Sequence, residues 1–287
     1  MSEHQPLIGG ESRRHPIHSH FKHVSIPLFC VCVCLAYPNH VDTFEQCVPQ
    51  SREAFAELLG TAVLVIFGTG VIASTVLSGG THGGWININL GWGLGLMAGI
   101  YTAGGISGAH LNPAVTLTLA VNRRFPWSKL ALYWAAQFIG AFLGAAVVYA
   151  TYYPALQGSK FGGFGPSTRG IFATYPQPYV GTIGGFISEF VGTFMLLFVI
   201  LATSDSTNNP AGHNTPLVLG LTLTAIGASL GLETGFALNP ARDFGPRLFT
   251  AIAGWGFDVF TANENYTWIP LVAPLFGGLA AGVVSTM

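Results

Sequence analysis

The sequence predicts an all-α membrane protein in which six transmembrane helices and two re-entrant half-helices form an inverted repeat. Half of the 287 residues are hydrophobic and only 8% are charged, whereas soluble domains carry about a quarter charged residues. Six apolar segments approach the roughly 20 residues that a helix needs to cross a bilayer. The two halves of the chain, about residues 53–153 and 183–287, also resemble each other. A net charge of −1 gives no electrostatic reason to expect a nucleic-acid partner.

The first 52 residues differ from the rest of the chain. We interpret residues 1–52 as a cytoplasmic, poorly ordered N-terminal tail and residues 53–287 as the membrane domain. The apolar run 24–37 contains Pro27 and is too short to span a bilayer, although a secretory signal remains an alternative. All the cysteines lie in the tail, and their spacing fits no standard disulfide or zinc framework. They are Cys30, Cys32, Cys34 and Cys47.

Eight apolar segments define the membrane domain. The six predicted spans are residues 55–77, 86–103, 130–153, 183–203, 217–232 and 268–287. Two further segments, 111–121 and 238–252, are too short to span and are expected to be surface helices or re-entrant half-helices. The chain ends with the last predicted span at Met287, which is typical of a shortened C-terminus.

The basic residues predict the orientation in the membrane. Those before the first span and between the second and third spans outnumber those on the opposite side, and the cytoplasmic side normally carries the excess. Both termini are therefore predicted to be cytoplasmic. The larger group is Arg13, Arg14, Lys22, Arg52, Arg123, Arg124 and Lys129, and the smaller is Lys160, Arg169, Arg242 and Arg247.

Two pairs of short sequences repeat between the halves. Segment 56–61 (AELLGT) opens the first span, and segment 188–193 (SEFVGT) lies in the fourth. Segment 107–114 (SGAHLNPA) follows the second span, and segment 234–241 (TGFALNPA) follows the fifth. Each copy holds three spans, an odd number, so the second copy is inserted upside down. Inverted repeats of this kind place shared sites near the middle of the membrane.

The repeated Asn-Pro-Ala motif suits the start of a helix, because proline is favoured at the first helical position and asparagine caps it. A half-helix that starts in mid-membrane leaves backbone N–H groups without partners, and inversion makes two such positive ends face one lumen. The two asparagines can each donate an amide hydrogen to a passing oxygen. The motif residues are Asn112, Pro113, Ala114, Asn239, Pro240 and Ala241.

These motifs resemble those of the major intrinsic protein family, the aquaporins and aquaglyceroporins, over about residues 53–287. Two matched motifs in opposed halves are a very specific signal. The resemblance implies an aquaporin-like fold and a homotetramer, with a plasma membrane favoured over an internal one. A third Asn-Pro-Ala, at residues 209–211, lies in a polar run and has no inverted mate, so we interpret it as a turn between the fourth and fifth spans.

Three polar residues near the motifs need an explanation. Glu57 and Glu189 lie one turn into spans, where ionisable groups are costly and usually have partners. The resemblance implies that each accepts hydrogen bonds from the nearby re-entrant backbone, and the alternative is that they reach out to the membrane interface. His110 is expected to brace its loop through hydrogen bonds, because no second metal ligand stands at a suitable spacing.

The same resemblance implies that the pore narrows at an outer filter formed by Trp92, Gly227, Phe236 and Arg242. Water-selective members typically carry histidine at the position of Gly227 and phenylalanine at that of Trp92. Here glycine is expected to leave room, so that the two aromatic rings form an apolar corner for the carbon face of a polyol while Arg242 takes its hydroxyl groups. The alternative for each aromatic residue alone is packing against lipid or the core.

The sequence thus predicts a passive channel for glycerol and related uncharged solutes, with water, that excludes protons and ions. Further residues resemble the glycerol-facilitator signature, namely Asp243, Arg247, Pro274 and Leu275. A water-selective aquaporin, a secondary transporter of small polar solutes and a non-conducting scaffold protein are the alternatives. The sequence shows no phosphate-binding loop, metal cluster or catalytic set, so neither enzymatic activity nor a cofactor is expected.

Overall fold

A computed structural model describes residues 41–286 of the chain. The chain divides into two compact units, Met1–Pro49 and Gln50–Met287, and the second contains the helical bundle. Most of the predicted tail, with Cys30, Cys32 and Cys34, lies outside the described residues. The first described helix, α2, begins at Val41, ahead of the predicted boundary at residue 53.

The described residues form helices and no strands, as the predicted fold class requires. Each predicted span coincides with one long helix, and each of the two shorter apolar segments coincides with a short helix. The long helices are α2 (Val41–Leu77), α3 (Trp85–Ser107), α5 (Leu130–Gly158), α7 (Thr182–Thr203), α8 (Thr215–Leu230) and α11 (Trp268–Val284). The two half-helices are α4 (Pro113–Val121) and α9 (Pro240–Thr250). The connections contain η2 (Trp127–Lys129), α6 (Pro166–Arg169), η3 (Gly212–Asn214), η4 (Ala251–Trp255) and α10 (Asp258–Asn265).

Length and hydropathy alone identify only part of this bundle as membrane-spanning. Three segments qualify, Gln50–Leu77, Trp127–Gly158 and Thr182–Thr203, and a fourth qualifies if α10 and α11, which meet at 67°, are counted together. Helices α8 and α11 have 16 and 17 residues, slightly short of a full crossing. Helix α3 is long enough at 23 residues, but glycine and asparagine lower its hydropathy.

Glycines allow the long helices to pack closely in pairs that match between the two halves. A Cβ atom on Gly140 of α5 would collide with the carbonyl of Leu58 on α2, and one on Gly277 of α11 would collide with the carbonyl of Phe190 on α7. Small residues at helix crossings are typical of membrane bundles, because packing there replaces the hydrophobic effect. The repeated sequence therefore yields repeated helix contacts.

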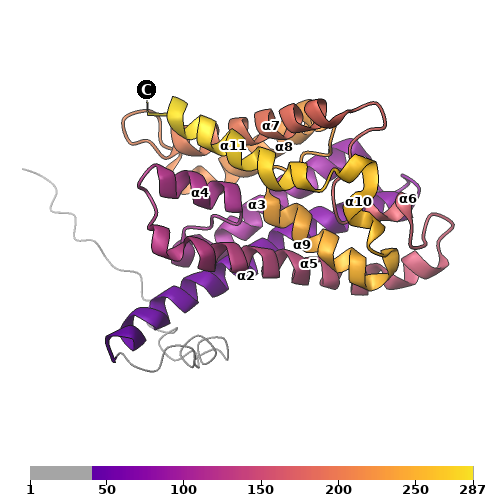
Figure 1. The fold of residues 1–287 in the computed structure, drawn as a ribbon, viewed down its shortest axis with the longest axis horizontal. Helices are drawn as coiled ribbons and strands as arrows, with labels where there is room; N and C mark the ends of the chain where they lie inside the picture. The colour runs from indigo at the N-terminus through magenta and orange to yellow at the C-terminus, as the bar shows by residue number, and fades with distance from the viewer. Residues whose placement is uncertain (1–40, 287) are drawn as a thin grey trace, which may run out of the picture. The chain divides into compact units, whose positions relative to one another are not determined.

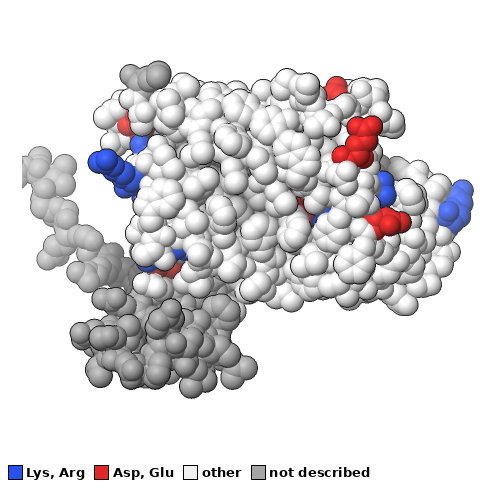
Figure 2. All heavy atoms as spheres, in the orientation of Figure 1, with Lys and Arg blue, Asp and Glu red and all other residues white. Residues whose placement is uncertain are grey.

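The bundle places the half-helices and the charges as a membrane protein requires. Figure 1 shows α4 and α9 in opposite halves of the bundle, with α11 packed beside α7 and contacting both half-helices. Figure 2 shows charged side chains gathered toward the two ends of the bundle, with a wide uncharged band between them. Exposed large hydrophobic side chains, such as Phe67, Leu94 and Ile187, lie on the outer faces of the long helices. This distribution is that of an integral membrane protein.

Candidate functional site

Asn112 and Asn239 cap the two half-helices, as the sequence predicts. Each has an extended backbone and is followed by proline at the first helical position. The Oδ1 atom of Asn112 accepts a hydrogen bond from the backbone N–H of Ala114 at 2.8 Å. The Oδ1 atom of Asn239 accepts from the N–H groups of Ala241 and Arg242 at 3.0 and 3.2 Å. The local sequence alone accounts for these caps.

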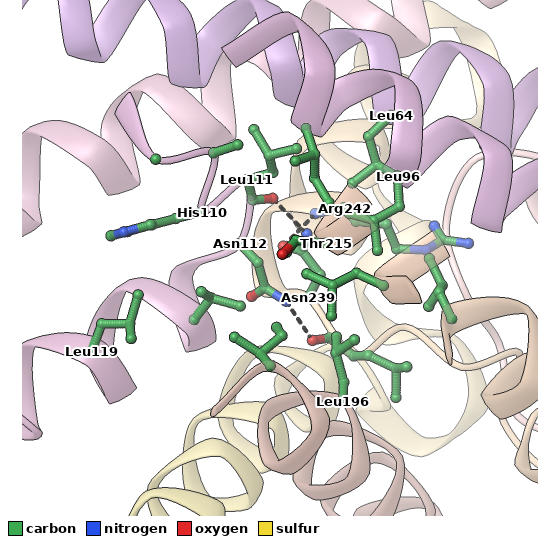
Figure 3. Close-up of a pocket in the computed structure, with 18 of the residues that line it drawn as sticks. Leu64, Leu96, His110, Leu111, Asn112, Leu119, Leu196, Thr215, Asn239 and Arg242 are labelled. Carbon is green, nitrogen blue, oxygen red and sulfur yellow. Dashed lines mark hydrogen bonds between the residues drawn. The ribbon is translucent and has the colours of Figure 1, made fainter. Parts of the chain in front are cut away.

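The two asparagines also tie the half-helices together across the repeat (Figure 3). Asn112 Nδ2 donates to the Leu238 carbonyl at 2.9 Å, and Asn239 Nδ2 donates to the Leu111 carbonyl at 2.8 Å. An amide nitrogen carries two hydrogens, so each asparagine keeps one for a solute in the cavity that both residues line. The loops that supply the carbonyls contain left-handed residues, with φ of 55° at Leu111 and 54° at Leu238.

A buried glutamate holds each of these loops. Glu57, fully buried in α2, accepts hydrogen bonds from the backbone N–H groups of His110 and Leu111 at 2.9 and 2.7 Å. Glu189, fully buried in α7, accepts from those of Ala237 and Leu238 at 3.0 and 2.8 Å. Side chains add to both sets, and they are Ser107 and Gln137 at Glu57 and Thr234 at Glu189. The matched contacts agree with the prediction made for both acids.

His110 braces the first loop from its other side. Its Nδ1 atom lies 3.2 Å from the hydroxyl of Thr116, and its ring packs against those of Phe125 and Tyr133 at centroid distances of 4.7 and 5.1 Å. The imidazole also lines the inner cavity. Among residues 41–286, no group of three or more His, Cys, Asp or Glu side chains is placed to hold a metal ion.

Two cavities meet at three of the four predicted filter residues. The inner cavity, of about 230 Å³, contains the asparagines and is lined mostly by aliphatic side chains. The outer cavity, of about 310 Å³, lies toward the loops before α7 and after α8. Trp92, Phe236 and Arg242 line both cavities, so they form the boundary between them. The structure therefore brings these three residues together, and their role as a filter stays a prediction.

Arg242 is held in place at this boundary. Its guanidinium lies 4.0 Å from the centre of the Trp92 ring, and its Nη1 donates to the carbonyl of Phe172 at 3.1 Å. A planar guanidinium over an indole face is a favourable cation–π arrangement. Arginine has five N–H donors, so most of them remain for a solute. The Phe236 ring meets the ring of Trp85 edge to face at a centroid distance of 5.8 Å.

Gly227 is the filter position where the structure differs from the prediction. It lines neither cavity. A Cβ atom added to it would lie 2.5 Å from Asn89 Oδ1 and 2.9 Å from Phe236 Cζ. The space that glycine leaves is therefore filled by the Phe236 ring and the Asn89 amide, and it does not widen the lumen directly.

Asp243 and Arg247 form a fully buried ion pair beside the filter, with Arg247 Nε 2.8 Å from Asp243 Oδ1. Asp243 accepts hydrogen bonds from the N–H and hydroxyl of Thr174 at 2.7 and 2.6 Å. Arg247 donates to the carbonyls of Thr174 and Val259 at 2.6 and 2.8 Å. The pair thus fixes the loop whose Phe172 carbonyl holds Arg242.

A family model described as Major intrinsic protein matches residues 45–285 of the chain. The chain belongs to the major intrinsic protein family. It is 58% identical over 238 residues to Aquaglyceroporin-2 of Rhizophagus irregularis, covering 81% of this chain and 75% of that protein. It is 46% identical over 239 residues to Aquaporin-9 of Homo sapiens, covering 82% and 81%. The X-ray structure of the aquaglyceroporin from Plasmodium falciparum matches with a TM-score of 0.75 and 38% identity, covering 82% of this chain and 94% of that one.

The residues around the filter in this major intrinsic protein differ in part from those that the sequence indicates. Pro274 and Leu275 lie in α11 and line neither cavity. Conversely, Phe172, Thr174 and Asn89 surround the filter residues, although the sequence analysis did not select them. Phe172 acts through its main-chain carbonyl, and Thr174 lies in a loop far along the chain from α9, which it contacts. No local sequence pattern therefore marks either residue.

Proposed function

We propose that this protein is a passive channel that conducts glycerol and water across a membrane and excludes ions and protons. The observation that carries the proposal is the boundary between the two cavities, where Trp92 and Phe236 present aromatic surface and Arg242 presents hydrogen-bond donors. A polyol has a carbon face and a hydroxyl face, which these two kinds of surface complement. The relatives named aquaglyceroporins support the same solute.

The route from the filter inward is suited to a chain of small uncharged solutes. Asn112 and Asn239 project into the inner cavity among side chains such as Leu64, Leu96 and Leu196 (Figure 3). One free amide hydrogen on each asparagine offers a hydrogen bond to a solute oxygen, while the aliphatic wall accepts its CH groups. Because the wall of the inner cavity holds few fixed polar groups, a solute binds there weakly enough to leave again.

Cation exclusion follows from the orientation of the half-helices. Helices α4 and α9 begin at Pro113 and Pro240, and their capping asparagines are joined through the neighbouring loops. The N-terminal ends carry partial positive charge, and Arg242 adds a full charge at the filter. A cation or proton at this point loses hydration and meets repulsion, whereas a neutral molecule does not. A cation-coupled transporter would need an ion site where these positive ends lie.

The orientation and assembly form part of the same proposal. Both termini face the cytoplasm, because basic residues are in excess on that side of the predicted topology. The protein acts in the plasma membrane as a homotetramer, which the family resemblance supports.

Purified protein in liposomes tests the proposal. After a sudden rise in external glycerol, vesicles first shrink and then recover as glycerol enters, and light scattering follows both phases. We expect fast recovery with the protein and slow recovery in protein-free vesicles, with a linear dependence on the glycerol gradient. Saturable uptake that needs a proton or sodium gradient would instead support a transporter. Vesicles that recover no faster than protein-free controls would support a scaffold, and a pH gradient that collapses through the protein would refute ion exclusion.

A further inference from the structure

Asn89 of α3 is a buried polar residue whose side chain has no hydrogen-bond partner within the described part of the chain. It is 0% exposed, and neither Oδ1 nor Nδ2 forms a hydrogen bond with any of the described residues. Its main-chain oxygen accepts from the Thr224 hydroxyl at 3.3 Å. Burying an amide without partners is costly, and a leucine of similar size would pack there without that cost. The presence of asparagine therefore indicates a polar partner that is not among the described residues.

The amide lies directly behind the filter ring of Phe236. A Cβ atom added to Gly227 would be 2.5 Å from Asn89 Oδ1 and 2.9 Å from Phe236 Cζ, so both groups converge on one small space on α8. Phe236 lines both cavities and Asn89 lines neither. The amide is therefore next to a ring that lines the passage, without lining the passage itself.

A second unpaired group lies one helical turn away. Trp92 Nε1 also has no hydrogen-bond partner within residues 41–286, and the Trp92 side chain is 2% exposed. Trp92 lines both cavities at their boundary. Two unpaired donors and one unpaired acceptor, all on α3, therefore lie close to the boundary between the two cavities. A hydroxyl group complements this set, because it donates and accepts at once.

We propose that Asn89 is a solute-selecting residue of the filter, whose amide binds a hydroxyl group of the polyol when Phe236 turns aside during passage. The proposal rests on the glycerol conduction proposed above. Phe236 has a left-handed backbone, with φ of 43°, which is unusual for an aromatic residue. Its ring packs on two glycines, Gly227 of α8 and Gly231 just after it, where no side chain lies between the ring and the backbone. Water is small enough to pass without moving the ring, so its passage does not need Asn89.

Two matched pairs of proteins separate polarity from size. The wild type and Asn89→Leu differ in polarity at similar size, and Asn89→Ser and Asn89→Ala differ in polarity at a smaller size. Asn87→Leu, on an exposed position of the same helix, is the control for the chemical change. Full-length protein is placed in liposomes at equal density, and stopped-flow light scattering gives glycerol and water permeability for each.

We expect the glycerol-to-water permeability ratio to fall about three- to ten-fold in Asn89→Leu, the effect of one hydrogen bond lost at the barrier. The ratio should also be lower for Asn89→Ala than for Asn89→Ser, and unchanged for Asn87→Leu. Equal ratios within both pairs would show that Asn89 only fills space. Equal falls in glycerol and water permeability would show that the amide supports the pore wall and not the solute. A wild type that conducts water but no glycerol would instead refute the proposed function. If Asn89→Leu does not fold, the Ser and Ala pair decides alone.

Discussion

Gly227 lies beneath the ring of Phe236, and its missing side chain decides where that ring rests. The family resemblance implies that glycine at this position leaves room for the solute. In the structure the room is taken by the ring, which meets the glycine at a distance too short for any Cβ atom. Gly227 therefore affects the lumen indirectly, because it sets the position of the Phe236 ring that lines both cavities.

Gly227→Ala tests this arrangement. The added methyl group would lie 2.9 Å from Phe236 Cζ and 2.5 Å from Asn89 Oδ1, so the ring must move toward the passage. We expect glycerol permeability to fall about tenfold or more, equivalent to about 1.4 kcal/mol at the barrier, with a smaller loss for water. Gly105→Ala is the matched control, because a Cβ atom there meets nothing within 4 Å. Stopped-flow measurements that show equal losses for both solutes would contradict the assignment of the ring to the filter.

Asn112→Ala and Asn209→Ala separate a motif that builds the pore from one that does not. The first variant loses the cap on Ala114 and the bond to Leu238, both buried. We expect it to lower the free energy of unfolding by about 2–4 kcal/mol, because it removes a helix cap and leaves the Leu238 carbonyl without this hydrogen bond. Asn209 is exposed in the connection before α8, and its replacement should change neither stability nor flux. Denaturation temperature in detergent measures the contrast, and equal shifts in both variants would argue against it.

At the scale of structural elements, each re-entrant loop depends on one acid in a neighbouring long helix. Glu189 accepts three hydrogen bonds, two of them from backbone N–H groups that the loop cannot satisfy internally. A buried N–H without a partner is costly in a membrane, where no lipid group can replace it. The carboxylate therefore stabilises a loop conformation that contains Phe236 and Leu238 in left-handed backbone geometry.

Glu189→Gln should weaken this support, because the amide group that replaces one oxygen is itself a donor and faces donors. We expect a loss of about 2–3 kcal/mol of stability and a lower yield of folded protein. Glu53→Gln is the control, because Glu53 pairs with Lys129 where both side chains are partly exposed, and such pairs contribute about 0–1 kcal/mol. Thermal unfolding of the purified proteins compares them. A Glu189→Gln protein as stable as Glu53→Gln would show that the re-entrant loop before α9 keeps its conformation without the carboxylate.

The sequence predicts those helices whose position is determined by a local pattern of residues. Asparagine and proline favour a helix start, and the first residues of α4 and α9 fall where the two repeated motifs place them. Long apolar runs likewise specify α2, α5 and α7. The resting place of the Phe236 ring could not be predicted, because it depends on Gly227 and Asn89 on two other helices. The same holds for the loop at Thr174, which the Asp243–Arg247 pair fixes from a distance.

At the scale of the whole molecule, the residues that line the cavities and the cysteines fall in separate parts of the sequence. The cavity-lining residues lie between Leu64 and Arg242, and every cysteine in the sequence precedes residue 48. Mercurial reagents are therefore expected to leave glycerol and water flux unchanged in the wild type. Leu196→Cys, which puts a thiol on the wall of the inner cavity, should become sensitive. Stopped-flow traces before and after the reagent test both statements. Reversible block of the wild type would place a native thiol on the route.

The exchange of hydrogen bonds between the two asparagine caps also sets an order in time. Asn112 and its acceptor on Leu238 are 126 residues apart, and a ribosome that adds about 5–20 residues per second needs about 6–25 s to make that stretch. During this interval the first half of the chain is already made, while the amide of Asn112 has no permanent partner. Each half can form its own cap, but the hydrogen bond from each asparagine Nδ2 needs a carbonyl of the other half. Until the second half is inserted, the Nδ2 group of Asn112 must therefore find another acceptor, such as water, in place of the Leu238 carbonyl.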